Sequence, residues 1–334
     1  MKVVITGGTG FIGRRLARRL LQRGALIGPG GKETAIDELV LFDVAPPQPP
    51  IAPNNRLKIV TGDIADVATV RALIDKGTGT VFHLAAAVSG QAEADTDIGY
   101  RVNLDGTRAV LEACRALGTQ PRLVFASSLA VYGGDMPPAV ADDTPLTPQT
   151  SYGNQKAIGE FLVNDYSRKG FVDGRALRLP TIVVRPGRPN RAASTWCSSI
   201  FREPLSGVGV ACPVGPDAAM ALLSPRRLVA AMEQIHDLPA ERLGYDRAVL
   251  LPGISASVAE MVEAVRRAGG EAAVKRIRWE PDPVIQKIVA GWPRAIQAKR
   301  AESLGIRADD SVDEIVQAFI EDDLPAQKAL VAGR

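Results

Sequence analysis

Histidine and cysteine are scarce in this sequence of 334 residues, and their scarcity argues against several kinds of catalytic centre. The two histidines, His83 and His236, are far apart, so neither zinc catalysis nor a Ser-His-Asp triad is a good interpretation. The three cysteines, Cys114, Cys197 and Cys212, are odd in number and lack the spacing of metal ligands. We therefore expect three reduced thiols in a reducing compartment, and hence a cytoplasmic protein.

The sequence also lacks a strong charge excess and a long apolar run. Its 40 basic and 37 acidic residues leave a net charge of +3, and the arginines do not gather with aromatic side chains, so no nucleic-acid partner is expected. No apolar stretch reaches membrane-spanning length, and the first residues run directly into a strand. We therefore expect neither a membrane segment nor a signal peptide. With 46% apolar and 23% charged residues, the composition is that of a globular protein.

A glycine motif near the beginning of the chain is the strongest signal that the sequence does contain. Val3 to Ile5 predict a buried strand, glycines follow at positions 7, 8, 10 and 13, and residues 14–21 predict an amphipathic helix. Gly7 permits a tight turn, Gly10 lets a pyrophosphate approach the backbone, and Gly13 lets helix and strand pack closely. The helix N-terminus offers unpaired N–H groups to phosphates, so the motif predicts dinucleotide binding.

Strand and helix patterns alternate along the first half of the chain. Further strands are expected at 38–42, 57–60, 80–84, 122–126 and 174–179, and helices at 66–76, at 96–117 and from about residue 150. This alternation predicts an α/β fold with a Rossmann-type doubly wound parallel sheet. Frequent prolines follow, and helices are expected at 192–206, 225–236, 258–268 and 312–322, with a strand at 248–251. We therefore predict an NAD-binding domain over 1–180 and a smaller substrate-binding lobe over 181–334.

Asp43 stands at the end of the second expected strand, where a carboxylate can accept hydrogen bonds from both ribose hydroxyls of an adenosine. It would repel a 2′-phosphate, and neither residue 44 nor residue 45 is a lysine or an arginine. This favours NAD over NADP. Arg14 is the nearest cation that could accommodate NADP, and a strand-end cap is the alternative role of Asp43.

Tyr152 and Lys156 lie on one face of an expected helix, because they are four residues apart. A tyrosine that accepts a proton near neutrality needs its pKa lowered from ~10 to about 7, and one cation ~4 Å away supplies about that much. Ser128, at the end of the fifth expected strand, can hold the substrate oxygen beside the phenol. The alternative is an exposed helix pair without a catalytic role. His83 is interpreted as a packed strand residue rather than a catalyst.

Together these motifs resemble an extended short-chain dehydrogenase/reductase of the NAD-dependent epimerase/dehydratase family, over residues 1 to about 185. The resemblance rests on the glycine motif, Asp63-Ile64, His83-Leu84-Ala85-Ala86, Asn103 with Gly106-Thr107, Ser128 with Val131-Tyr132-Gly133, and Tyr152 with Lys156. It implies NAD as the cofactor and Tyr152 as the proton-transfer residue. It also implies that Lys156 binds the nicotinamide ribose and lowers the pKa of Tyr152. Ser128 would orient the substrate hydroxyl, and Asn103 would brace the site.

The resemblance also assigns a set of binding residues. The implied cofactor-binding residues are Gly7, Gly10, Phe11, Ile12, Gly13, Asp43, Asp63, Ile64, Leu84, Ala85, Ala86, Tyr152, Lys156 and Pro180. Asp63 and Ile64 would flank the adenine. The expected substrate contacts are Ser127, Ser128, Tyr152, Thr181 and Arg185, and no metal is expected.

A narrower similarity lies downstream. It covers Leu179-Pro180-Thr181 through Gly187, Asn190, Ala193-Ser194 and Phe201-Arg202-Glu203-Pro204. These residues are similar to a branch of the family that oxidises the 2-hydroxyl of the four-carbon sugar acid D-erythronate with NAD. Nucleotide-sugar epimerases of the family usually carry an aromatic pair and an Asn where Leu179-Pro180-Thr181 stand. Arg185 could clamp the substrate carboxylate through two parallel hydrogen bonds, or form a structural salt bridge. Arg191 and Arg202 are the alternative anchors.

The sequence thus favours an NAD-dependent dehydrogenase acting on a small sugar acid. A nucleotide-sugar epimerase or dehydratase is the rival of the same fold. A catalytically silent dinucleotide sensor is the rival of another class, although such a protein need not keep both Tyr152 and Lys156.

A homodimer is implied as well, since members of the family pair the helices that correspond to 96–117 and 151–169 into a four-helix bundle. Apolar residues at helical spacing are Leu104, Val110, Leu111, Ile158, Phe161 and Leu162. They could equally face the sheet.

Overall fold

The computed structural model describes residues 1–188 and 194–333, which gather into two compact units. The first unit comprises residues 1–131, 150–178 and 229–249. The second comprises the described parts of 132–149, 179–228 and 250–334. The prediction divided the chain once, after residue 180, whereas each of these units consists of three separate segments of the chain.

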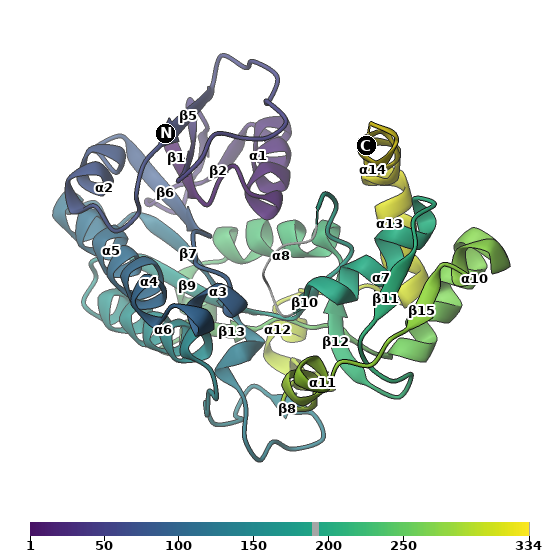
Figure 1. The fold of residues 1–334 in the computed structure, drawn as a ribbon. Helices are drawn as coiled ribbons and strands as arrows, with labels where there is room; N and C mark the ends of the chain where they lie inside the picture. Colours follow the sequence, from purple (N-terminus) through teal and green to yellow (C-terminus); the bar gives the residue numbers. More distant parts are fainter. Residues whose placement is uncertain (189–193, 334) are drawn as a thin grey trace. The chain divides into compact units, whose positions relative to one another are not determined.

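The first unit is built on a seven-stranded sheet in the order β13-β9-β7-β6-β1-β4-β5 (Figure 1). The strands are β1 (Lys2–Thr6), β4 (Glu38–Asp43), β5 (Leu57–Thr61), β6 (Thr78–His83), β7 (Arg122–Ser128), β9 (Asp173–Leu179) and β13 (Ala248–Leu250). Strands β5, β4, β1, β6 and β7 run parallel, and Val4 lies opposite Val40 on one side and Val81 on the other. The prediction of a Rossmann-type α/β fold is confirmed.

Helices cover both faces of this sheet, so that Val3, Val4 and Ile5 of the central strand β1 are each 0% exposed (Figure 1). One face carries α1 (Phe11–Arg23) and α8 (Pro225–Asp237), and the other carries α2 (Val67–Leu73), α5 (Gly106–Leu117) and α6 (Ser151–Arg168). Smaller elements complete the unit. They are β2 (Ala25–Ile27), β3 (Glu33–Ala35), α3 (Ser89–Ala94), α4 (Thr96–Gly99), η1 (Tyr100–Asp105), η2 (Leu129–Val131) and α9 (Ala240–Leu243).

Two segments of this unit differ from the sequence-based expectation. The helix expected over 96–117 is divided into α4, the π-helix η1 and α5. The segment between α1 and β4, for which no strand was expected, contains the antiparallel hairpin of β2 and β3. A π-helix adds one residue to a helical turn, and such turns occur frequently at functional sites. Asn103 lies within η1.

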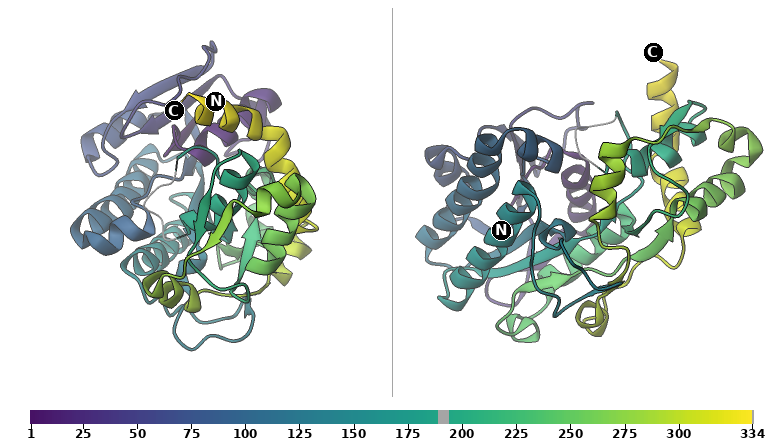
Figure 2. Two further views of the ribbon diagram at one scale, coloured as in Figure 1. Left: turned by 45° about the vertical axis from the view of Figure 1, so that its right-hand side comes forward. Right: turned by 60° about the horizontal axis from the view of Figure 1, so that its bottom comes forward.

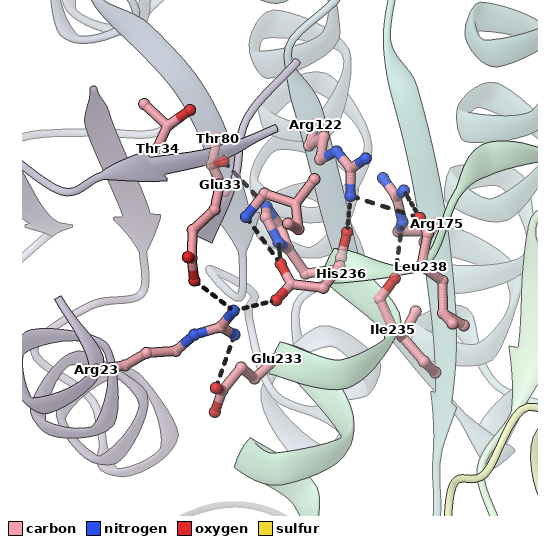
Figure 3. A network of polar contacts seen from close by, with 12 residues as sticks. Arg23, Glu33, Thr34, Thr80, Arg122, Arg175, Glu233, Ile235, His236 and Leu238 are labelled. Atoms are coloured by element: carbon pink, nitrogen blue, oxygen red, sulfur yellow. Dashed lines mark hydrogen bonds and ion pairs between the residues drawn. The ribbon is translucent and has the colours of Figure 1, made fainter. Parts of the chain in front are cut away.

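Two buried arginines fix the C-terminal end of α8 to the sheet (Figure 3). Arg122 on β7 donates hydrogen bonds to the backbone oxygens of His236 and Leu238, and Arg175 on β9 donates to those of Ile235 and Leu238 at 2.9 Å. The last carbonyls of a helix have no partner within the helix and carry its negative dipole end, so guanidinium groups satisfy both needs. These contacts attach the later segment of the first unit to its sheet.

The second unit contains short strands and a cluster of helices. Its strands are β10 (Thr181–Ile182), β12 (Ala219–Leu223) and β14 (Ile254–Ser257) in one sheet, with the pairs β11 (Val210–Cys212)–β15 (Ile277–Trp279) and β8 (Val140–Ala141)–β16 (Ile296–Gln297). Its helices are α7 (Thr195–Leu205), α10 (Val258–Val274), α11 (Pro283–Ala290), α12 (Lys299–Ser303), α13 (Val312–Asp322) and α14 (Leu324–Ala332). Helix α10 packs against α7 and α13 around a core that includes Phe201, Met261 and Phe319 (Figure 2).

All three cysteines are buried free thiols. No group of three metal-ligating side chains occurs among residues 1–188 and 194–333. In the same residues, no helix combines the length and apolar character needed to cross a membrane.

Candidate active site

The glycine motif forms a closely packed turn between β1 and α1. Gly7 has φ +67°, and a Cβ atom there would lie 2.8 Å from the amide nitrogen of Ala85. A Cβ on Gly13 would lie 2.5 Å from the carbonyl oxygen of Gly7. Either substitution would force backbone atoms apart, so both glycines are required for the close packing of this turn.

The N-terminus of α1 is available to a negatively charged ligand. Gly10 is its N-cap, without a side-chain cap, and the first turn, which includes Phe11 and Ile12, contains no acidic residue. The first N–H groups of a helix and its positive dipole end favour phosphate. The bare turn and the uncapped helix end therefore fit the pyrophosphate of a dinucleotide.

Asp43 ends β4 beside the glycine turn. Its carboxylate accepts hydrogen bonds from the backbone N–H of Thr9 at 3.1 Å and of Val44 at 2.8 Å. These contacts orient a half-buried carboxylate at the place where the motif predicts the adenosine ribose. Arg14 donates a hydrogen bond to the backbone oxygen of Gln48 at 2.9 Å. The cation that could accommodate a 2′-phosphate thus already has a partner in the neighbouring loop.

Asp63 and Ile64, predicted to flank the adenine, follow β5. The carboxylate of Asp63 accepts a hydrogen bond from the backbone N–H of Ala65 at 2.9 Å and pairs with Arg101 on η1. These two interactions lower the pKa of Asp63. Ile64 is 6% exposed and packs in the core. Arg101 could not be identified from the sequence, because 38 residues separate it from Asp63.

The residues that follow β6 are positioned by a hydrogen bond to the side chain of Thr6. Leu84, Ala85 and Ala86 are partly exposed, and the N–H of Ala85 donates to the hydroxyl of Thr6 at 3.2 Å. Leu84 and Ala85 pack directly against Gly7 at the carboxyl end of the sheet, the edge at which ligands of doubly wound folds bind.

Asn103 connects three parts of the first unit. Its Oδ1 accepts from the N–H of Ala87 at 2.7 Å, while its Nδ2 donates to the carbonyl of Ala87 at 3.1 Å and to Oε1 of Gln155 at 2.7 Å. Asn103 is 2% exposed, and both polar atoms of its side chain are engaged within the unit. Its contacts are those of a brace between η1, the loop after β6 and α6.

Ser128, Tyr152 and Lys156 are brought together by β7 and α6. The hydroxyls of Ser128 and Tyr152 are hydrogen-bonded to each other. The Lys156 Nζ donates to the backbone oxygen of Ala126 at 2.7 Å and lies 5.6 Å from the centre of the Tyr152 ring. A phenol, a hydroxyl and an ammonium group thus meet at the carboxyl end of β7.

Burial determines the charge state of this group. It raises the pKa of Tyr152 to about 12, against the opposing effect of the Ser128 hydrogen bond. It lowers the pKa of Lys156 to about 7, against the opposing effect of the Glu160 carboxylate. At neutral pH, without cofactor, Tyr152 is therefore protonated and Lys156 is charged in only part of the molecules. The expectation that Lys156 lowers the pKa of Tyr152 does not describe this state and stays a prediction for the cofactor-bound protein.

Ser127 points to a different environment from Ser128. It is 3% exposed, and its hydroxyl donates to Oε1 of the buried Glu160 on α6. Arg178 on β9 pairs with the same carboxylate at 2.8 Å. The predicted contact between Ser127 and substrate is not favoured by this geometry, because the hydroxyl is already engaged inside the protein. Sequence reasoning did not consider Glu160, although it lies one helical turn beyond Lys156.

Both histidines are packed inside the first unit. The ring nitrogens of His83 lie 2.7 Å from the Thr6 hydroxyl and 2.9 Å from the Thr107 hydroxyl. Burial lowers the pKa of His83 to about 3 and that of His236 to about 4, so both are neutral at physiological pH. His236 contacts the Thr80 hydroxyl at 3.0 Å (Figure 3). The interpretation of His83 as a packed strand residue agrees with these contacts.

The remaining predicted residues belong to the second unit. Pro180 is buried, and Thr181 is partly buried on β10 opposite Leu222. Arg185 is partly exposed, its backbone N–H donates to Ser198 at 3.0 Å, and within the described residues its guanidinium has no carboxylate partner. Burial and the nearby Arg202 both lower the pKa of Arg185. An unpaired, partly desolvated guanidinium is suited to an anionic ligand.

Arg202, an alternative anchor, is differently placed. It is 1% exposed and donates to the carbonyl of Arg185 at 2.7 Å, to Ser199 at 3.0 Å and to Glu203 at 2.7 Å. Both of its Nη atoms are therefore engaged internally, while its buried Nε has no partner among the described residues. Arg191, the other alternative, lies outside the described residues, as do Asn190 and Ala193.

Comparisons with known proteins show which family this chain resembles over most of its length. The profile of the NAD-dependent epimerase/dehydratase family matches residues 3–209. A D-erythronate dehydrogenase from Cupriavidus necator is 57% identical over 322 residues, covering 96% of this chain and 98% of the relative. One from Haemophilus influenzae is 44% identical over 326 residues, covering 97% and 100%. The crystal structure of a nucleoside-diphosphate-sugar epimerase from Agrobacterium tumefaciens superimposes with a TM-score of 0.91 at 42% identity, covering 98% of this chain and 96% of that one.

Proposed function

Because the chain belongs to the NAD-dependent epimerase/dehydratase family, we propose that it oxidises the 2-hydroxyl of D-erythronate with NAD. It is an NAD-dependent oxidoreductase that acts on a CH–OH group of a sugar acid. The observation that carries the assignment is the meeting of Ser128, Tyr152 and Lys156, in a chain with two D-erythronate dehydrogenase relatives of full length. Its three free thiols favour a reducing, cytoplasmic location.

NAD fits the residues of the first unit. The bare glycine turn and the uncapped N-terminus of α1 would hold the pyrophosphate, and Asp43 would accept hydrogen bonds from the adenosine ribose. Lys156 would donate to the nicotinamide ribose. When bound, NAD supplies the acceptor for the hydride that leaves the carbinol carbon.

Residues of this chain would accept the proton of the substrate hydroxyl. Ser128 would hold the substrate hydroxyl beside the phenol, and Tyr152 would take the hydroxyl proton as the carbon–oxygen bond becomes double. Because the pKa of Tyr152 is about 12 without cofactor, the phenolate needs positive charge nearby. The Lys156 ammonium, 5.6 Å from the ring centre, is the group of this chain that can provide it.

The direct test is incubation with NAD and a panel of four- to six-carbon sugar acids. We expect NADH absorbance to rise with D-erythronate, with smaller rates for acids of other stereochemistry or length. Absence of NADH with every acid of the panel would contradict the proposal.

A nucleotide-sugar epimerase is the second candidate, favoured by the 42% identical epimerase structure. An epimerase returns the hydride to its substrate within one cycle, so no NADH accumulates. Leu179-Pro180-Thr181, in place of an aromatic pair and an Asn, does not favour this activity. Conversion between two UDP-hexoses without net NADH would identify it.

Asp43→Ala should weaken NAD binding and narrow the preference for NAD over NADP. The carboxylate would no longer accept the ribose hydroxyls or repel a 2′-phosphate, and the expected loss is about tenfold in NAD affinity, as for a charged hydrogen bond of ~1.5 kcal/mol. Fluorescence titration with both cofactors measures this. Glu38→Ala is the control, because Glu38 lies at the other end of β4 and pairs only with exposed Lys58 among described residues. A wild-type protein that already prefers NADP would contradict the role of Asp43.

We also propose that the protein is a homodimer through the helical segment 96–117, which comprises α4, η1 and α5, and through α6. Phe161 on α6 is 62% exposed, while Leu104, Ile158 and Leu162 are partly exposed. Val110 and Leu111 are 0% exposed in the core, so these two do not contribute to an interface. Self-association of exposed apolar helix faces is the expected way to cover such a surface.

Light scattering at micromolar concentration should return twice the chain mass for the wild type and the chain mass for Phe161→Glu. Val284→Glu is the control, because Val284 on α11 of the second unit is an apolar side chain that is 67% exposed. A wild-type monomer would refute the dimer. A Phe161→Glu protein that stays dimeric would place the interface elsewhere.

A further inference from the structure

Helix α6 presents three functional groups in successive turns toward the end of β7. Tyr152 is hydrogen-bonded to Ser128, Lys156 to the backbone oxygen of Ala126, and Glu160 to Ser127. Residues four apart on a helix lie above one another, so one face of α6 holds three consecutive residues of the strand. The last of these three pairs has no part in the chemistry described above.

Glu160 is a buried carboxylate with well-formed partners. Glu160 is 3% exposed, and its Oε1 accepts a hydrogen bond from the hydroxyl of Ser127. The Nε of Arg178 lies 3.1 Å from each of its oxygens, and Nη2 lies 2.8 Å from Oε2. Such a fork fixes the carboxylate in one position. Ser127, and with it the end of β7, is therefore held from α6.

The groups whose charge bears on Lys156 come from several elements. Tyr152 and Glu160 lie on α6, His83 on β6 and Arg178 on β9. Tyr152 is protonated and His83 is neutral, so neither contributes a charge near pH 7. Arg178 offsets part of the Glu160 charge. Among these groups only Glu160 can stabilise the ammonium form of Lys156.

We propose that Glu160 is a positioning residue for Tyr152 and Lys156, acting through Ser127 on the end of β7 and through its negative charge one helical turn from the ammonium. This inference rests on the proposed function, because the Tyr152–Lys156 pair matters only to an enzyme of this kind. Burial alone drives Lys156 toward the neutral form, and Glu160 opposes this effect. Without Glu160 fewer molecules would carry the positive charge that Tyr152 requires.

The alternative is a buried ion pair that supports folding and nothing else. Both roles predict some loss of stability after substitution, because a buried Arg178 without its partner is costly. They differ in pH dependence. If the pair is purely structural, its substitution changes neither the protonation of Lys156 nor the pH profile of the molecules that fold.

Glu160→Gln separates the two roles, because glutamine keeps the shape and an oxygen for Ser127 but loses the charge. We expect kcat for NADH formation at pH 8 to fall about tenfold, and the alkaline limb of the kcat profile to move about one pH unit toward acid, since one pKa unit is a factor of ten. KM for the acid should stay within about threefold, since Glu160 would act through Lys156 and Ser127 without touching the acid.

Asp173→Asn is the matched control, because Asp173 lies at the other end of β9 and pairs with Arg175 at 2.9 Å and Arg247 at 3.3 Å. It should lose stability without any change in the pH profile. If Glu160→Gln does not fold, Glu160→Gln combined with Arg178→Gln removes the unpaired charge and should show a shift in the same direction. At least one of these two Glu160 variants should fold. If the pH profile of its kcat coincides with that of the wild type, the proposal is overturned.

A titration of Lys156 separates this inference from the proposed function. In ¹⁵N-lysine-labelled protein without NAD or substrate, with the Lys156 signal assigned by Lys156→Met, we expect the titration midpoint to fall in Glu160→Gln and to stay in Asp173→Asn. If this occurs although D-erythronate gives no NADH, the proposed function fails and the role of Glu160 stands. If NADH forms and neither the midpoint nor the profile moves, the inference about Glu160 alone is wrong.

Discussion

Tyr152→Phe should lower the turnover of D-erythronate oxidation by about 10²–10⁴-fold, the usual contribution of a positioned proton-transfer group. NAD affinity should stay within about twofold, because the substitution removes one hydroxyl that contributes little to cofactor binding. The hydroxyl is hydrogen-bonded to Ser128, and the ring lies 5.6 Å from the Lys156 ammonium, so Phe can keep the ring position.

The pH dependence of the wild type gives a second expectation for this residue. Because burial raises the pKa of Tyr152 to about 12, the protonated form predominates at neutral pH and must lose its proton for oxidation. The rate of oxidation should therefore rise with pH on the acid side of the alkaline limb that deprotonation of Lys156 sets, and the residual rate of Tyr152→Phe should lack this rise.

Tyr166→Phe is a matched control on the same helix. Tyr166 is also a tyrosine whose pKa is raised to about 12, but its hydroxyl is bonded to Glu112 on α5. Its removal should leave turnover unchanged. Steady-state NADH formation and NAD titration measure both variants. Turnover of Tyr152→Phe within tenfold of the wild type, with or without an effect of Tyr166→Phe, would refute the proton-transfer assignment.

The sheet and its flanking helices could be predicted because their signals are local. The alternation of apolar strands with amphipathic helices fixes a parallel sheet, and Thr150 is a recognisable N-cap whose side chain accepts from the N–H of Gly153 at 3.0 Å. The division of the 96–117 helix could not be predicted. Its π-helical turn contains Asn103, whose contacts with Ala87 and Gln155 are tertiary, and periodicity carries no information about them.

The interleaving of the two units has a similar cause. Helix α8 was expected from its pattern, but the carbonyls of Ile235 and Leu238 are bound by Arg122 and Arg175 from strands more than fifty residues earlier. Buried arginines are unusual in apolar strands. Their presence in β7 and β9 was the sequence feature that could have indicated a polar partner inside the unit. What they bind depends on the path of the chain, which composition and proline spacing do not specify.

Within the site, the sequence could not distinguish the two adjacent serines. Ser127 and Ser128 have the same chemistry and neighbouring positions, but Glu160, 33 residues away, engages the first and Tyr152 the second. The charge state of Lys156 without cofactor could not be predicted for the same reason. A spacing of four residues places an ammonium beside a phenol, but the burial that lowers its pKa to about 7 comes from the whole fold.

Arg185→Lys should raise KM for D-erythronate strongly, with a loss on the order of a hundredfold in kcat/KM, and leave NAD affinity unchanged. A small acid offers few contacts, so much of its selectivity has to come from its carboxylate. A guanidinium gives two parallel charge-assisted hydrogen bonds, and a lysine ammonium cannot reproduce that geometry. Arg185 is suited to this role, because its guanidinium has no carboxylate partner within the described residues and burial lowers its pKa.

The amide of D-erythronic acid provides a sharper measurement than KM alone. The wild type should discriminate against this neutral analogue by about the same hundredfold factor, and Arg185→Lys should lose most of that discrimination because it removes the bidentate contact. A general disturbance of the second unit would instead slow both compounds equally. Arg202→Lys is the comparison, since Arg202 is 1% exposed and already binds Ser199, Glu203 and the carbonyl of Arg185.

The outcomes assign the anchor. If Arg185→Lys loses discrimination while Arg202→Lys keeps it, the carboxylate binds Arg185. If Arg185→Lys behaves as the wild type and a variant of Arg202 or Arg191 does not, the anchor moves to that residue and the substrate class stands. If all three variants discriminate as the wild type does, no arginine of this segment recognises the carboxylate. The assignment of a small acid as substrate would then lose its physical basis in this chain.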